Sequence, residues 1–170
     1  MKNILYVFLI SILPIIELRG AIPVGAALGI PFYLNYPAAI FGNLLPVPFI
    51  LLFIPKILDF LARFKIFRPV VEWVRKKAYK YSGRIVEDAD AEAESEKKKS
   101  RRFGGAFWGL LFFVMIPLPG TGAWTGSLIA SLFSLPKRSS FLAILLGVLG
   151  AGVIMCLASY GAVGFLKIFL

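Results

Sequence analysis

Apolar stretches of two different lengths alternate along this chain of 170 residues. A helix needs about 20 apolar residues to cross the hydrocarbon core of a bilayer. Residues 37–55 and 141–166 are long and uncharged enough to do so. The remaining apolar stretches hold only 13 to 15 residues each, and they are 2–16, 23–35, 103–116 and 122–135. These lengths predict two spanning helices and four half-helices, with a kink at Pro46 and Pro48 in the first span.

The composition predicts an all-α integral membrane protein. The chain is 59% hydrophobic and 16% charged, which is too apolar for an ordinary soluble domain. Its net charge of +10 does not indicate nucleic acid, because 14 of the 19 basic residues fall within 56–102, as in one cytoplasmic loop of a plasma-membrane protein. Cys156 is the only cysteine and there is no histidine, so we expect neither a disulfide, a bound metal nor another cofactor.

The half-helices pair into two units that resemble each other. Aligning residues 19–22 with 121–124 places a Pro-containing apolar arm before each break, a short arm after it, and a long helix beyond. We interpret this as an internal duplication, with a first repeat over 1–56, a linker over 57–102 and a second repeat over 103–170. The alternative is that any two apolar hairpins broken by Gly and Pro would align about as well.

Charge placement predicts how the two units lie in the membrane. The turn at 31–36 is uncharged, whereas the turn at 135–140 carries Lys137 and Arg138 and belongs on the basic, cytoplasmic side. Half-helices of roughly 20 Å cannot each cross about 30 Å of hydrocarbon, so both hairpins are expected to be re-entrant. Each unit then crosses the membrane once, and the second is inverted relative to the first.

The linker is predicted to lie at the inner membrane surface. Residues 57–80 mix aromatic and basic side chains at near-helical spacing, as in an amphipathic helix on the leaflet or a cytoplasmic extension of the preceding helix. Residues 87–96 are acidic and Ala-rich, and 97–102 are basic. This part is expected to be an exposed helical or disordered segment, or a patch that binds lipid head groups.

The first break holds the only two charges between Lys2 and Lys56, which are Glu17 and Arg19. Ionisable groups this deep in apolar sequence mark a functional site by default. Pro14 can end one arm and Pro23 can begin the next, so residues 17–22 are expected to be unwound beside a watery cavity. Glu17 could then carry a proton, or it could only neutralise Arg19 as a buried ion pair.

The second break offers polar groups without charges. The run 117–122 is rich in Pro and Gly, which allow backbone N–H groups to approach a ligand but also suit any tight turn. Arms beginning near Pro23 and Gly122 would point their positive ends at the centre, where Arg19 completes an anion site. The candidate residues for binding substrate or protons are Glu17, Arg19, Gly20, Pro23, Pro117, Pro119, Gly120, Thr121, Gly122, Trp124 and Thr125.

Residues 17–23, Glu-Leu-Arg-Gly-Ala-Ile-Pro, and 117–126, Pro-Leu-Pro-Gly-Thr-Gly-Ala-Trp-Thr-Gly, resemble the small multi-drug export protein family. The hairpins also look like a compact version of the DedA superfamily, whose members resemble phospholipid scramblases or undecaprenyl-phosphate transporters. That second resemblance implies Glu17 as the embedded acid and Arg19 as an embedded basic residue. Thr121 stands where a second arginine would align, so a two-arginine phosphate clamp does not follow.

These patterns lead to two transport hypotheses. The first is a proton-coupled carrier or flippase for an amphipathic anion, such as a polyprenyl phosphate or phospholipid. The alternative is an exporter of lipophilic cations by proton antiport, in which Trp124 supplies cation–π contact. An enzyme is not expected, because the acids outside the linker are few and scattered and no Ser-His or Cys-His pair can exist. Membrane lipids, protons and a small amphipathic substrate are the expected partners, and a homodimer is the oligomer to test.

Overall fold

The computed structural model describes residues 2–61, 69, 95–118, 120–133 and 135–169, which form helices and no strand. Two helical stretches, Phe32–Ile57 and Lys137–Ala162, are long and apolar enough to cross a membrane. Most of the predicted linker helix and Pro119 lie outside the described residues. The helices are α1 (Lys2–Ile12), α2 (Glu17–Ala27), α3 (Phe32–Leu44), α4 (Pro46–Leu61), α6 (Ser95–Met115), α7 (Ala123–Leu132) and α8 (Lys137–Phe169).

The first hairpin breaks earlier than the sequence predicts. Residues 13–16 form the turn, and α2 is already helical from Glu17, so the prediction of an unwound segment over 17–22 is wrong. Pro23 lies inside α2 and does not begin an arm. The helix accepts this proline at the loss of one backbone hydrogen bond, the one that the carbonyl of Arg19 would otherwise accept. The reversal of the chain is completed at Glu17, whose φ of 51° is rare for a residue with a side chain.

The first long helix begins at Phe32, directly after Pro31, so the turn is shorter than the predicted 31–36. Pro31 has extended backbone and suits the position before a helix, whereas Pro37 lies inside α3. Of the two prolines predicted to kink the first span, Pro46 lies at the interruption, because α3 ends at Leu44 and α4 begins at Pro46, whereas Pro48 lies in the first turn of α4. A proline there cannot donate the hydrogen bond that would continue the helix.

The second hairpin breaks where its Pro and Gly residues predict. Helix α6 ends at Met115 before Pro117, and α7 begins after Gly122. Gly120 has a φ of 84°, a conformation that glycine adopts at no steric cost. Helix α8 begins at Lys137, directly after Pro136, in the way that α3 follows Pro31.

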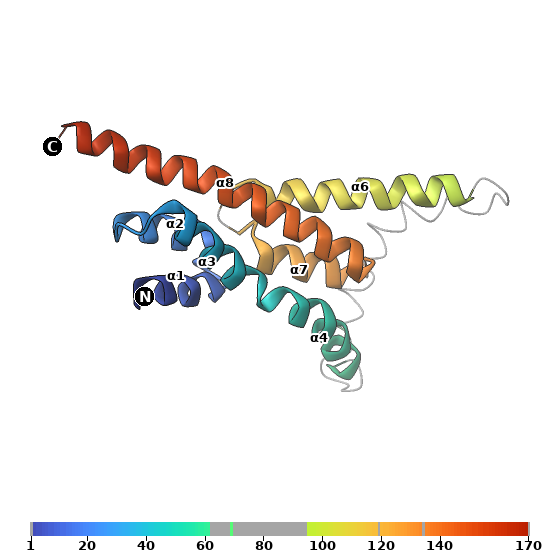
Figure 1. The fold of residues 1–170 in the computed structure, drawn as a ribbon. Coiled ribbons are helices and arrows are strands. Elements are labelled where there is room, and N and C mark those ends of the chain that lie inside the picture. Colours follow the sequence, from blue (N-terminus) through green and yellow to red (C-terminus); the bar gives the residue numbers. More distant parts are fainter. Residues whose placement is uncertain (1, 62–68, 70–94, 119, 134, 170) are drawn as a thin grey trace.

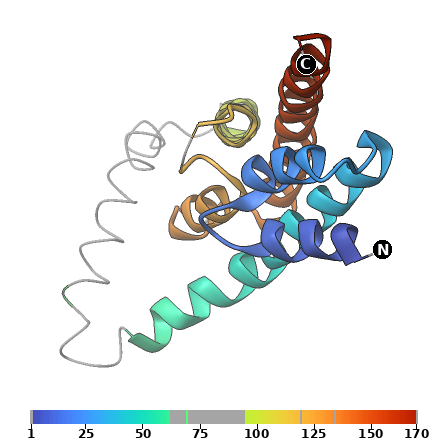
Figure 2. The same cartoon turned by 90° about the vertical axis from the view of Figure 1, so that its left-hand side faces the viewer.

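The two hairpins point in opposite directions along the long axis of the molecule (Figure 1). The N-terminus and the α2–α3 turn lie at one end, and the α7–α8 turn and the start of α6 lie at the other. Each hairpin packs on the long helix of the other half, α2 against α8 and α7 against α4. Figure 2 shows α6 nearly end-on beside α8, which is seen obliquely, with the first hairpin on the other side of α8.

Hydrogen bonds around Pro31 and Pro136 give the two halves a common register. Before the first proline, the Ile30 N–H donates to the Gly25 carbonyl at 3.0 Å; before the second, the Leu135 N–H donates to the Ala130 carbonyl at 2.9 Å. Four residues after each proline, the N–H of Asn35 or Ser140 donates back to the proline carbonyl. Superposing these turns places Arg19 opposite Trp124, so the alignment of Arg19 with Thr121 is off by three residues.

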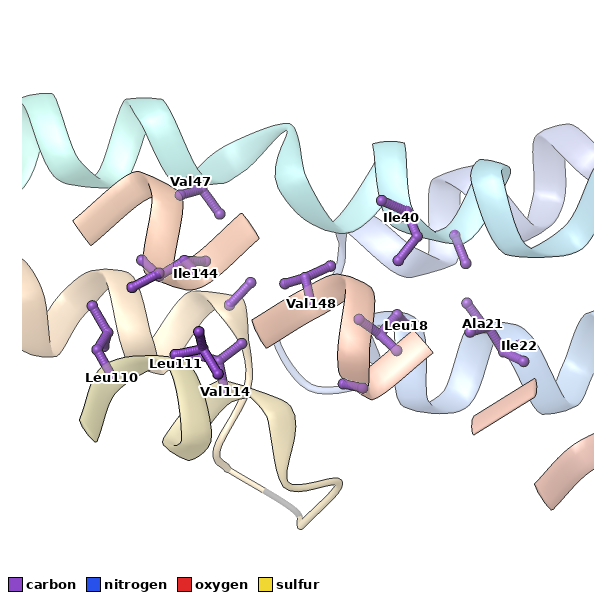
Figure 3. Packing of buried hydrophobic residues seen from close by; sticks show 14 of the residues in the cluster. Leu18, Ala21, Ile22, Ile40, Val47, Leu110, Leu111, Val114, Ile144 and Val148 are labelled. Carbon is purple, nitrogen blue, oxygen red and sulfur yellow. The ribbon is translucent and has the colours of Figure 1, made fainter. Parts of the chain in front are cut away.

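Close helix packing follows the same register. Gly42 of α3 and Gly147 of α8 occupy matching positions, and a Cβ on either would meet a backbone carbonyl of the preceding arm, Phe8 or Leu111. Close glycine contacts of this kind are how helices associate where lipid gives no hydrophobic drive. One buried cluster joins both halves: in Figure 3, Val148 of α8 lies beside Leu18 of α2.

Candidate functional site

Arg19 reaches across from the first hairpin to the break of the second. Its Nη1 donates to Glu17 Oε2 at 3.0 Å, which also makes the ion pair. Its Nη2 is within hydrogen-bond distance of the carbonyls of Val114 and Ile116, at 3.2 and 3.0 Å, and of Thr121 Oγ1 at 2.9 Å. The carbonyls belong to the C-terminal end of α6, where the negative end of the helix dipole favours a cation.

The Glu17 carboxylate lies at the other side of the break between α6 and α7, at the N-terminal end of α7. Its Oε1 accepts the backbone N–H of Trp124 at 3.2 Å, in the first turn of α7. Gly122 is needed for this approach, because a Cβ there would overlap the Glu17 carboxylate. Glu17 is only 4% exposed. The positive end of α7, which the sequence offered to an anionic ligand, is therefore occupied by the protein's own carboxylate.

Trp124 makes a second contact between the hairpins, in the reverse direction. Its Nε1–H donates to the carbonyl of Ile12, the last residue of α1, at 2.9 Å. Arg19 and Trp124 occupy matching positions and each donates to the final carbonyls of the other hairpin's first arm. We call these four residues, Glu17, Arg19, Thr121 and Trp124, the clamp.

The other predicted residues divide into those that shape the clamp and those outside it. Thr121 Oγ1 can donate to the carbonyl of Ile116 or of Leu118, at 2.7 and 2.9 Å, and so ties the turn together. Thr125 donates to Gly122 in its own turn, at 3.2 Å. Gly20 faces Ile16, whose side chain would overlap a Cβ there. Pro117 and Gly120 are exposed in the turn, and Pro23 lies further along α2.

Sequence reasoning missed the carbonyl acceptors of Val114, Ile116 and Ile12. The signal was present, because the last four carbonyls of any helix lack an intrahelical donor and both arms end at breaks. What the sequence did not show is that each break would be satisfied by a side chain from the other hairpin. In the part of the chain that the structure describes, no group of three or more His, Cys, Asp or Glu residues could hold a metal ion.

The clamp therefore pairs two charges inside an apolar shell. Four oxygen acceptors surround one guanidinium, and a carboxylate and a helix N-terminus neutralise each other beside it. The Arg19 side chain is 14% exposed, so the pair is largely removed from solvent. Removing one partner of such a pair typically costs about 3–5 kcal/mol, because the other charge is left buried and uncompensated.

Two long apolar helices and two broken hairpins joined by buried charges define a transporter-like integral membrane protein. The chain matches the family described as "Putative small multi-drug export protein" over residues 17–154 and belongs to this family. The match spans every residue of the clamp. No curated protein and no solved structure matches the chain. The resemblance to the DedA superfamily is not shown by these comparisons and stays a prediction.

Proposed function

We propose that the chain exports small lipophilic cations in exchange for protons, with the clamp as the site where both bind. The observation that carries this proposal is the set of oxygens around Arg19, which comprises one carboxylate, one hydroxyl and two carbonyls. Such an acceptor-rich surrounding favours a cation and disfavours a second anion. In the absence of cargo, the Arg19 guanidinium then occupies the cation site at Glu17. The family's description agrees with this class of cargo.

Cargo can replace Arg19 at Glu17 while both groups keep hydrogen-bond partners. If a cation takes over Glu17 Oε2, Arg19 still has the carbonyls of Val114 and Ile116 and the hydroxyl of Thr121. Glu17 keeps the N–H of Trp124. The exchange therefore leaves neither group without a hydrogen-bond partner, and the cost that remains is the loss of the counter-charge of Arg19.

A proton competes with the cargo for the same carboxylate. Protonated Glu17 is neutral and attracts neither Arg19 nor a cationic cargo. Because one group cannot hold both, a proton arriving from one side expels cargo bound from the other. This competition is the simplest form of antiport, and it needs only Glu17 to be reached from the two sides in turn.

We infer that this alternation comes from two inverted repeats with re-entrant hairpins, and that 57–102 lies in the cytoplasm. The opposite directions of the hairpins and the basic residues Lys137 and Arg138 beside one turn support it. Asn35 is buried, so the accessible reporters are Tyr33→Cys and Arg138→Cys in a Cys156→Ser background. An impermeant thiol reagent should label them from opposite sides. Labelling of both from one side would refute the inverted arrangement.

An amphipathic anion is the second candidate, and one observation favours it. The Nε–H of Arg19 is buried and, among the described residues, has no hydrogen-bond partner. A phosphate oxygen could accept it, although the head group would first have to displace Glu17 from Arg19. The two candidates differ in which residue is indispensable for binding, Glu17 for a cation and Arg19 for an anion.

The test is exchange of tetraphenylphosphonium, a lipophilic cation, in proteoliposomes with an imposed pH gradient. Proteoliposomes with the unchanged chain should accumulate the cation in exchange for protons that flow down their gradient. Glu17→Gln should lose this gradient-driven uptake. Asp59→Asn, which removes an acid at the end of α4, is the matched control and should retain it. Gradient-driven uptake that persists in Glu17→Gln would refute the proposal. Binding of a phosphate-bearing lipid that depends on Arg19 and not on Glu17 would favour the anion.

A further inference from the structure

Asn43 is one of two buried asparagines of α3, and the other is Asn35. Asn43 is fully buried, at 0% exposure, and lies near the middle of the spanning stretch Phe32–Ile57. Ile40 and Val47 precede and follow it at helical spacing on the same face. Figure 3 shows Ile40 near Val148 and Leu18, and Val47 above Ile144, and all of these side chains belong to the buried cluster that joins the two halves. Asn43 therefore lies on the side of α3 that packs into this shared cluster.

Neither polar atom of the Asn43 amide has a hydrogen-bond partner within the described part of the chain. Burying an amide unpaired costs about 1–3 kcal/mol, so such a group needs an explanation. Asn35, on the same helix, is half satisfied by comparison: its Nδ2 donates to the Ile22 carbonyl at 2.8 Å and to the Tyr160 hydroxyl at 2.9 Å, whereas its Oδ1 has no partner among the described residues. Asn43 makes neither kind of contact.

Packing does not explain the amide either. In the register set by Pro31 and Pro136, Asn43 matches Val148 of α8, which is equally buried and fills its place with an apolar side chain of slightly larger volume. The matching place in the other half is thus filled without a desolvated amide. In the conformation of this structure, called closed below, the Asn43 amide is costly and packing does not require it. This points to a hydrogen-bonding partner that the amide meets in a second, open conformation.

We propose that Asn43 is a cargo-binding residue on the transport path, reached when the clamp opens. Its amide supplies donors and an acceptor and would take the polar, hydrogen-bonding part of the cargo, while Ile40 and Val47 contact the apolar part. The identity of the cargo in this inference rests on the proposed function. The opening of the path does not depend on it. Release of Glu17 from Arg19 frees α2 from the second hairpin and uncovers the face that carries Asn43.

Opening is tested by thiol accessibility in a Cys156→Ser background. A small charged methanethiosulfonate reacts with thiolate in water and not with a cysteine in lipid or protein. Asn43→Cys should react slowly in the otherwise unchanged chain and on the order of tenfold faster with Glu17→Gln, because a tenfold change needs less than the loss of a buried ion pair. Val7→Cys, equally buried on α1, is the control. No acceleration at position 43, or equal acceleration at position 7, overturns the inference.

Binding is tested with Asn43→Val. The variant should melt at a higher temperature than the unchanged chain, and its KM for ethidium, a lipophilic cation that carries two amino groups, should rise several-fold. Its KM for tetraphenylphosphonium, which has no hydrogen-bonding group, should stay unchanged and serves as the control. A lower melting temperature would mean that the amide is already needed in the closed molecule and would overturn the inference, as would an unchanged KM for ethidium. If the unchanged chain moves no tetraphenylphosphonium, the proposed function fails by itself. The accessibility result then still decides whether the Asn43 face opens.

Discussion

The two breaks share one architecture and differ in their chemistry. Each joins a first arm to a second at the centre of the molecule, and each donates from one side chain to the carbonyl end of the opposite arm. The first break supplies a carboxylate and a guanidinium, whereas the second supplies a hydroxyl, a helix N-terminus and an indole. One half thus brings charged side chains and the other brings backbone dipoles to receive them.

This difference has an energetic reason. Two buried ion pairs related by symmetry would double the desolvation cost without a second function. Trp124 replaces Arg19 at the matching position and gives a neutral hydrogen bond in the same geometry. Gly122 replaces Glu17 and leaves the space that the carboxylate fills. The two hairpins therefore hold a single charged site, and the contribution of each half can be measured separately.

Arg19→Ala should have the largest effect, because it removes the charged half of the comparison. The change leaves Glu17 buried without its cation and leaves the carbonyls at the end of α6 unpaired. We expect a loss of about 3–5 kcal/mol in the free energy of unfolding, measured by thermal melting in detergent. Arg19→Lys should recover part of it, since the forked donor is lost but the charge is kept.

The matched control for Arg19→Ala is the double variant Glu17→Gln, Arg19→Ala, in which both charges are absent. It should be more stable than Arg19→Ala alone, because no uncompensated charge remains. If the free energy of unfolding of Arg19→Ala is within about 1 kcal/mol of that of the unchanged chain, the pair behaves like an exposed salt bridge. The clamp then does not hold the hairpins together.

Gly122→Ala should have the next largest effect, because it fills the space reserved for the carboxylate. A Cβ at this position overlaps Glu17, whereas at Gly109 it would meet nothing within 4 Å, so Gly109→Ala is the control. We expect Gly122→Ala to cost about 1–3 kcal/mol. Glu17→Asp draws the carboxylate back and should restore part of the stability in the double variant. Equal effects of Gly109→Ala and Gly122→Ala would contradict the contact.

The sequence predicted the outline of the fold because the length of an apolar run and the Pro and Gly residues that end helices act locally. Two spans, four shorter arms and the turn at 117–122 follow from apolar run length and from Pro and Gly. It placed the start of α2 wrongly because Pro23 is a good first-turn residue, and nothing in the sequence shows that Glu17 will adopt a positive φ and begin the helix earlier. Local propensity could not reveal that strain, which contacts from the other hairpin stabilise.

The sequence predicted which residues form the site, but it did not predict which groups they would contact. Glu17 and Arg19 stand out as charges in apolar sequence, and Thr121 and Gly122 as polar or small residues in a break. That Arg19 would bind the end of α6, and that Trp124 would bind the end of α1, depends on how the hairpins interlock. Such contacts join residues about a hundred positions apart and leave no trace in local spacing.

Trp124→Phe should have the smallest effect, because it removes only the neutral half of the reciprocal contact. Phenylalanine keeps most of the ring packing and loses the Nε1–H that donates to Ile12. A neutral hydrogen bond contributes about 0.5–1.5 kcal/mol, well below the cost of stranding Glu17. If instead Trp124→Phe destabilised the protein as much as Arg19→Ala, the indole would be the main tie between the hairpins. The charged pair would then be free to serve binding alone, and the two halves would have exchanged the roles assigned to them.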